Sequence, residues 1–76
     1  MINITVTSLT KQHKVIELQG KLESVKAAAA KIDEQKMAYH LDYLDFNEIE
    51  NGRAIAEFVC HRRHHKKALD FIRNVC

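Results

Sequence analysis

The sequence has no proline and no tryptophan, and only two glycines and two cysteines among its 76 residues. Secondary structure is therefore interrupted at few positions and the chain has no flexible linker, which argues against a disordered adaptor. We expect residues 1–76 to form a single α+β domain, and no internal repeat is visible. Because a domain of this length buries only about 60% of its unfolded surface, we also expect a second copy to stabilise it as a homodimer.

Long hydrophobic runs and export signals are also missing. No stretch of about 18 apolar residues could cross a membrane. The first residues lack the basic end and the apolar stretch of a secretion signal. Two cysteines, Cys60 and Cys76, are too few for a disulfide framework and are expected to be reduced. These absences predict a cytoplasmic protein with no membrane partner.

Signatures of catalysis are largely absent as well. Ser8 and Ser24 have no nucleophile-elbow context, and two isolated glycines cannot form a phosphate-binding loop. We expect no cofactor, no small-molecule substrate and no enzymatic activity. A ribonuclease-like alternative remains, in which His40 and a histidine of the last helix act as acid and base beside Arg62 or Arg63.

The first half of the chain predicts a hairpin followed by a helix. Apolar and polar residues alternate over residues 2–7, and residues 14–18 contain β-branched side chains, which favours two strands. Residues 21–36 then follow a helical period, with one apolar face. The alternative is one long helix over residues 10–36, giving the order βαββα, which Gly20 disfavours because glycine weakens a helix interior.

The second half predicts another hairpin and another helix. Residues 39–49 and 53–60 flank Asn51-Gly52, which favours a two-residue type I′ turn that pairs Glu50 with Arg53. This register places Leu41 and Tyr43 on the face that carries Ala54, Ala56, Phe58 and Cys60, and it places Leu44, Phe46, Ile55 and Val59 on the other. With residues 61–76 as the last helix, the predicted order is ββαββα, with an apolar strip on the second sheet face for a dimer contact.

The most distinctive segment is the basic, histidine-rich stretch at the start of the last predicted helix. Its cations oppose the helix dipole, and a phosphate or carboxylate partner would compensate them. The candidate partner-binding residues are Arg62, Arg63, His64, Lys66, Lys67 and Arg73. The alternative is a solvated face balanced by acidic residues, either nearby or in a second subunit: Asp42, Asp45, Glu48 and Glu50.

A metal site is a weaker hypothesis for the same segment. Helical spacing would bring His61 near His65, with Cys60 adjacent, but no second ligand pair is apparent for a four-coordinate site. The sequence therefore favours a small non-enzymatic regulatory module that acts as a homodimer and binds an acidic protein through its last helix. A nucleic-acid-binding module that uses the same surface is the alternative.

Overall fold

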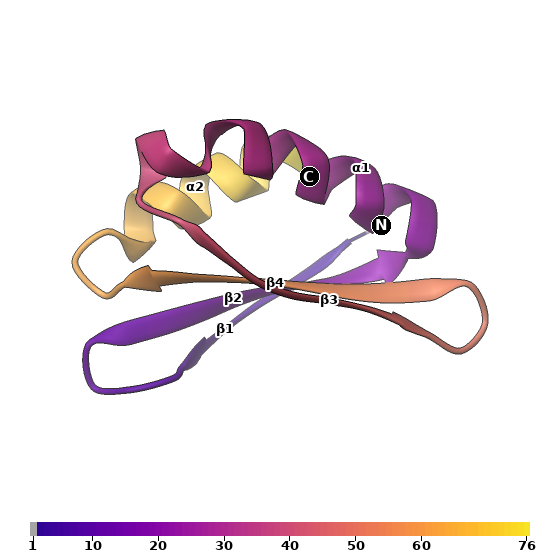
Figure 1. The fold of residues 1–76 in the computed structure, drawn as a ribbon, viewed down its shortest axis with the longest axis horizontal. Coiled ribbons are helices and arrows are strands. Elements are labelled where there is room, and N and C mark those ends of the chain that lie inside the picture. Colours follow the sequence, from indigo (N-terminus) through magenta and orange to yellow (C-terminus); the bar gives the residue numbers. More distant parts are fainter. Residues whose placement is uncertain (1) are drawn as a thin grey trace.

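The computed structural model describes residues 2–76 and contains one four-stranded antiparallel sheet with two α-helices on one face (Figure 1). The elements are β1 (Asn3–Ser8), β2 (His13–Lys21), α1 (Leu22–Gln35), the short 3-10 helix η1 (Lys36–Tyr39), β3 (Asp42–Ile49), β4 (Arg53–His61) and α2 (His65–Val75). The strand order is β1-β2-β4-β3, so β2 and β4 are central and β1 and β3 are the edges. The predicted ββαββα, α+β architecture is confirmed, and neither helix is long and apolar enough to cross a membrane in this part of the chain.

The long-helix alternative is not needed, because residues 13–21 form the central strand β2. Gly20 is buried in this strand opposite Ala54, so the destabilisation that glycine causes inside a helix does not arise. Strand β2 ends directly at α1, and the first helical N–H, that of Leu22, donates to the Gly52 carbonyl at 2.8 Å. The turn between β3 and β4 thus provides a backbone acceptor for an N–H group that the helix itself leaves unpaired.

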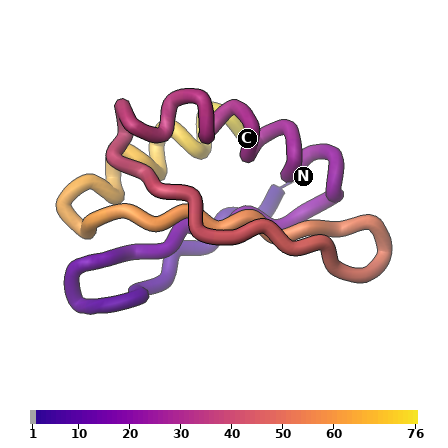
Figure 2. The backbone as a smooth tube through the Cα atoms, viewed as in Figure 1, coloured from indigo at the N-terminus to yellow at the C-terminus, as the bar shows by residue number. Residues whose placement is uncertain are grey.

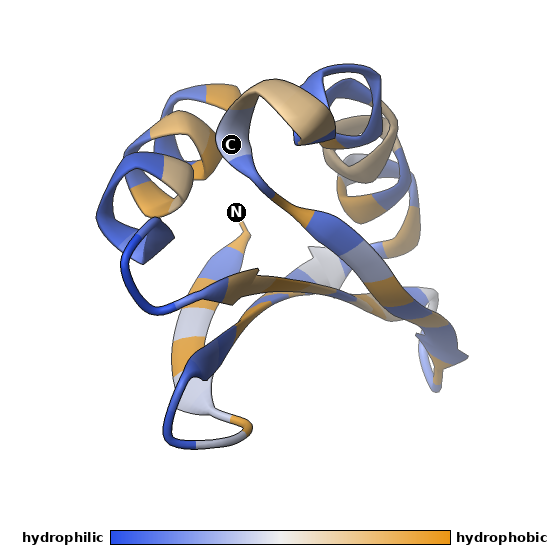
Figure 3. Cartoon of the chain, turned by 60° about the vertical axis from the view of Figure 1, so that its left-hand side comes forward, coloured by the Kyte–Doolittle hydropathy of each residue, from blue (hydrophilic) through white to orange (hydrophobic). Residues whose placement is uncertain are grey.

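The hydrophobic core lies between the helices and the helix-facing side of the sheet. On α1 the buried side chains are those of Val25, Ala28 and Ile32, which confirms its predicted apolar face, and on α2 they are those of Ala68 and Ile72. Hydrophobic and hydrophilic bands alternate along the strands, as expected for a sheet with one covered face (Figure 3). Phe58, at the centre of β4, is the largest fully buried side chain.

The register of the second hairpin differs from the prediction by one residue. Asn51 and Gly52 both have positive φ, as the predicted turn requires, but Ile49 and not Glu50 pairs with Arg53. A one-residue slip turns every side chain of a strand to the opposite face, so Phe46 lies opposite Ala56 on the helix side. Its predicted position on the other face was therefore wrong.

An irregularity at Leu44 restores the predicted face for the first residues of β3. The ladder shifts by one residue between Tyr43 and Asp45, and Tyr43 consequently lies opposite Phe58. Their rings meet edge to face, with centroids 5.7 Å apart. The predicted strand also began too early, since Tyr39 belongs to η1 and His40, with φ of 57°, reverses the chain before β3.

The two halves of the chain repeat the same ββα unit, although no repeat is visible in the sequence. Thr5 pairs with Glu17 in the first hairpin, and forty positions later Asp45 pairs with Glu57 in the second. Glu17 and Glu57 are also direct partners across the central β2–β4 ladder. Two glutamates and an aspartate thus form one row on the uncovered face of the sheet.

This uncovered face is less apolar than the predicted register required. Val15, Ile55 and Val59 are its aliphatic side chains on the central strands, and Glu17 and Glu57 separate them. Phe46 is absent from it because of the register slip. Glu17 and Glu57 lie at its centre and Lys21 and Arg53 at one end, so this face is more polar than the apolar strip expected from the sequence.

We predict that Glu17→Gln or Glu57→Gln stabilises the fold at pH 7 by about 0.5 kcal/mol, because like charges directly opposite on neighbouring strands repel. Urea unfolding monitored by circular dichroism measures the change in the free energy of unfolding. Since the repulsion belongs to the pair, the double variant is expected to gain less than the two single gains combined. Glu23→Gln on exposed α1 is the control, and equal gains in control and test variants would contradict the prediction.

Candidate functional site

Three segments that are distant in the sequence meet at one end of the sheet. The β1–β2 turn, the β4–α2 connection and η1 lie at this end, and the β3–β4 turn lies at the opposite end (Figure 2). His13 pairs with His61 at the last step of the central ladder. The backbone N–H of Arg62 donates to the Gln12 carbonyl at 2.8 Å, which ties the two connections together.

This end collects half of the lysines and arginines of the molecule and its histidines. We call it the basic end and define it by the side chains Lys11, His13, Lys14, His40, His61, Arg62, Arg63, His64, His65, Lys66 and Lys67. All five histidines of the chain belong to it. Across residues 2–76 the single salt bridge joins Lys36 to Asp33 at 3.0 Å, so no carboxylate is paired with a cation of the basic end.

The acidic residues proposed to balance this charge are arranged differently. Strand β3 begins near the basic end with Asp42, opposite Val59, and then runs away from it. Glu48 lies opposite Ala54, and Glu50 belongs to the turn at the far end. Within one molecule the acidic run therefore does not neutralise the basic end.

The last helix begins four residues later than the sequence predicted. His61 is the final residue of β4, and Arg62, Arg63 and His64 form the connection to α2. Hydrogen bonds order this connection, because the His64 N–H donates to the His61 carbonyl at 2.9 Å and His65 Nδ1 contacts the Arg62 carbonyl oxygen at 2.8 Å. The whole connection is hydrophilic (Figure 3). Only Lys66 and Lys67 of the predicted cations are in the first helical turn.

The shorter helix also changes the histidine geometry. His61 and His65 are not one turn apart on a helix, and Cys60 is buried on β4. His61 instead contacts His13, with ring centroids 5.5 Å apart, and its Nδ1 accepts the backbone N–H of Arg63 at 3.2 Å. Among residues 2–76 no group of three or more histidine, cysteine or acidic side chains is placed to hold a metal ion.

His40 and His64 form the second histidine pair of the basic end. Their rings stack at 3.9 Å with an angle of 16° between the planes. They line a cavity of about 370 Å³ together with Ala38, Tyr39 and Lys67. The two rings are in van der Waals contact, so no ligand lies between them in this arrangement.

The electrostatic environment lowers the pKa of two of these histidines. For His64, desolvation is the largest cause, followed by the charges of His40, Arg63 and Lys67. For His61, desolvation again comes first, followed by Arg63, His13, Arg62 and His64. Burial raises the pKa of the Cys60 thiol, which keeps it protonated and unreactive at neutral pH.

We predict that the free energy of unfolding falls as the pH is lowered from about 7 to about 5. The histidine pKa in the unfolded chain is about 6.5, so the unfolded chain takes up protons before the folded His61 and His64 do. The midpoint of urea unfolding, measured at both pH values, is expected to move to lower urea. In His61→Gln/His64→Gln the fall is smaller, and an undiminished fall would contradict these assignments.

The structure brings together most of the predicted partner-binding residues but not all. Arg62, Arg63, His64, Lys66 and Lys67 are in the basic end, whereas Arg73 lies in the last turn of α2, about 10 Å along the helix from Lys66. Sequence reasoning missed Lys11, His13 and Lys14, which come from the first hairpin. No local signal could have identified them, because their position depends on the pairing of β2 with β4.

Comparison with known protein families, curated proteins and solved structures finds no match to this chain. The functional argument therefore depends on the geometry and charge of the basic end.

Proposed function

We propose that the protein is a non-enzymatic binding module that holds the phosphate backbone of a nucleic acid at its basic end. The observation that carries this proposal is the convergence of six lysines and arginines from the β1–β2 hairpin, the β4–α2 connection and the start of α2, none of them in a salt bridge within residues 2–76. Phosphates of a nucleic acid are spaced regularly and bind dispersed cations by counterion release.

The start of α2 supports the same partner. The helix has no acidic residue in its first turn and no side-chain cap, and Lys66 and Lys67 add positive charge to the positive end of the helix dipole. A phosphate at this position would accept hydrogen bonds from the two lysines. Its negative charge would also be stabilised at the positive end of the helix dipole. His40 and His64 border the adjacent cavity, and His64, whose pKa is lowered, gains charge as the pH falls below that lowered pKa.

An acidic protein is the second candidate partner, and two exposed apolar side chains favour it. Leu9, in the β1–β2 turn, is 57% exposed, and Met37, in η1, is 85% exposed. Both belong to segments that border the basic end, and a protein partner would bury them. An interface of this kind would depend on Leu9 and Met37 as well as on charge, whereas phosphate binding would not.

We predict that the protein binds short RNA or DNA at about 50 mM salt and loses affinity steeply by about 200 mM. Fluorescence anisotropy with labelled single- and double-stranded oligonucleotides measures the dissociation constant and its salt dependence. Arg62→Ala/Lys66→Ala is expected to weaken binding and to reduce the salt slope by up to about 2, since each phosphate contact contributes about 0.9. Affinity is also expected to rise at acidic pH, once the folded His61 and His64 take up protons below their lowered pKa values.

The matched control is Lys21→Ala/Lys31→Ala, which removes the same charge from exposed positions away from the basic end. Equal loss of binding in both variants would indicate a general charge effect and contradict the proposed surface. Absence of binding at low salt would exclude a nucleic-acid partner. Binding of a labelled polyglutamate peptide to the wild type and to the Leu9→Ser and Met37→Ser variants then tests the alternative of an acidic protein partner.

A further inference from the structure

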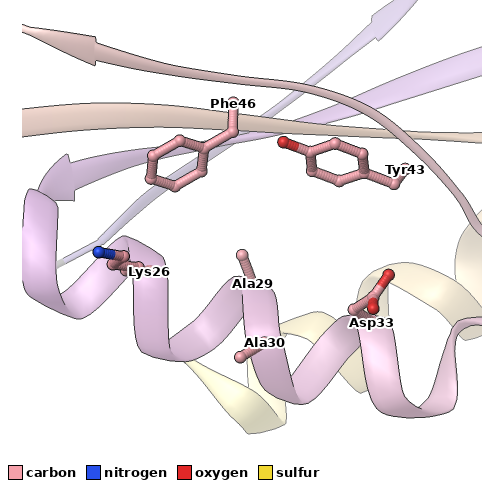
Figure 4. A pocket seen from close by; sticks show the side chains of 6 residues that line it. All are labelled: Lys26, Ala29, Ala30, Asp33, Tyr43 and Phe46. Carbon is pink, nitrogen blue, oxygen red and sulfur yellow. The ribbon is translucent and has the colours of Figure 1, made fainter.

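A second surface feature lies away from the basic end. An open groove of about 550 Å³ runs between α1 and the edge strand β3 (Figure 4). Its lining residues are Lys26, Ala29, Ala30 and Asp33 of α1, and Tyr43 and Phe46 of β3. The centre of the groove is thus apolar, and one charge of each sign belongs to its helical side.

The groove leaves aromatic surface accessible to solvent. Tyr43 is 47% exposed and Phe46 is half-buried, although both lie on the side of the sheet that the helices cover. The neighbouring Leu44 is 45% exposed at the strand irregularity. Strand β3 is an edge of the sheet, so nothing within the molecule continues the apolar surface beyond it. Such a patch, bordered by charges, is typical of a contact surface.

The charges of the groove are arranged symmetrically. Lys26 and Asp33 lie at equal sequence distances on either side of the Ala29–Ala30 step, about two helical turns apart. Figure 4 places Lys26 at the Phe46 end of the groove and Asp33 at the Tyr43 end. A two-fold axis through the groove centre would therefore bring Lys26 of each copy to Asp33 of the other. The same rotation brings Phe46 opposite Tyr43 of the second copy.

We propose that this groove is the interface of a homodimer, in which the α1 helices of two copies pack antiparallel. Charge complementarity identifies the second copy as the occupant, because the surface matches itself after a two-fold rotation, as an isologous interface must. The alanines at the centre allow the helices to approach closely. Asp33 contacts Lys36 at 3.0 Å but is 56% exposed, so its carboxylate retains acceptor sites for a second ammonium group.

The alternative dimer surface, the uncovered face of the sheet, has a row of carboxylates at its centre, formed by Glu17, Glu57 and Asp45. Its cations Lys21 and Arg53 lie together at one end of the ladder, so a two-fold axis through the centre of this face would place carboxylates opposite carboxylates. The groove therefore accounts for the dimer with a favourable arrangement of charge. It does not involve the basic end, so the two proposals are tested independently.

Charge reversal tests the interface by sedimentation velocity and light scattering over a concentration series. The wild type is expected to be a concentration-dependent dimer. Lys26→Asp and Asp33→Lys each replace two attractions with two repulsions and are expected to raise the dimer dissociation constant about tenfold or more. The double variant K26D/D33K restores both pairs, so its dissociation constant is expected to return close to that of the wild type.

Matched controls separate the groove from the rest of α1. Lys31→Asp makes the same charge change at an exposed position outside the groove and is expected to leave the dimer intact. Ala30→Arg places a large side chain in the groove and is expected to abolish the dimer, whereas Ala27→Arg, exposed on the same helix, is not. Circular dichroism confirms that each variant is folded.

Three outcomes would overturn the proposal. The wild type could remain a monomer at the highest soluble concentration, which would exclude self-association. The dimer could persist unchanged in Lys26→Asp and Ala30→Arg, which would place the interface elsewhere. The charge-swapped double variant could dissociate as readily as the single variants, which would exclude the pairing of Lys26 with Asp33.

Discussion

The antiparallel pairing of β2 with β4 is the interaction on which the rest of the structure depends. This ladder joins two hairpins from opposite halves of the chain, from His13 opposite His61 to Lys21 opposite Arg53. On one side it presents Leu18, Phe58 and their neighbours to the helices, and on the other it places Glu17 against Glu57. Long-range pairing of this kind costs loop-closure entropy, which the apolar side chains beneath the two helices offset when they become buried.

The same ladder determines where the charge accumulates. Each central strand has one connection at each end, and the β1–β2 turn and the β4–α2 connection emerge together. Lysines, arginines and histidines of both connections therefore become neighbours, although about fifty residues separate Lys11 from Arg62. A net charge of +2 conceals this accumulation, because acidic residues on β3 and in the central row offset it in the sum without lying at the basic end.

A small α+β layer leaves the groove as a consequence of its geometry. Helices α1 and α2 both lie over one face of the sheet, and the edge strand β3 extends beyond their cover (Figure 1). The register slip at the β3–β4 turn then directs Phe46 toward α1 and not toward the uncovered face. Phe46, which the sequence placed on the uncovered face of the sheet, consequently lines the groove beside α1.

The sequence by itself determined the kinds of elements and their order. The alternation over residues 2–7 and the helical spacing of Val25, Ala28 and Ile32 are local patterns, because the periods of a strand and of a helix are properties of the single element. Asn51-Gly52 likewise determined the positive φ angles of its turn. Only the tertiary structure decided the strand register, the late start of α2, the meeting of His40 with His64 and the contents of the groove. These depend on pairing between distant segments, where a shift of one residue exchanges the two faces of a strand and no local pattern records the choice.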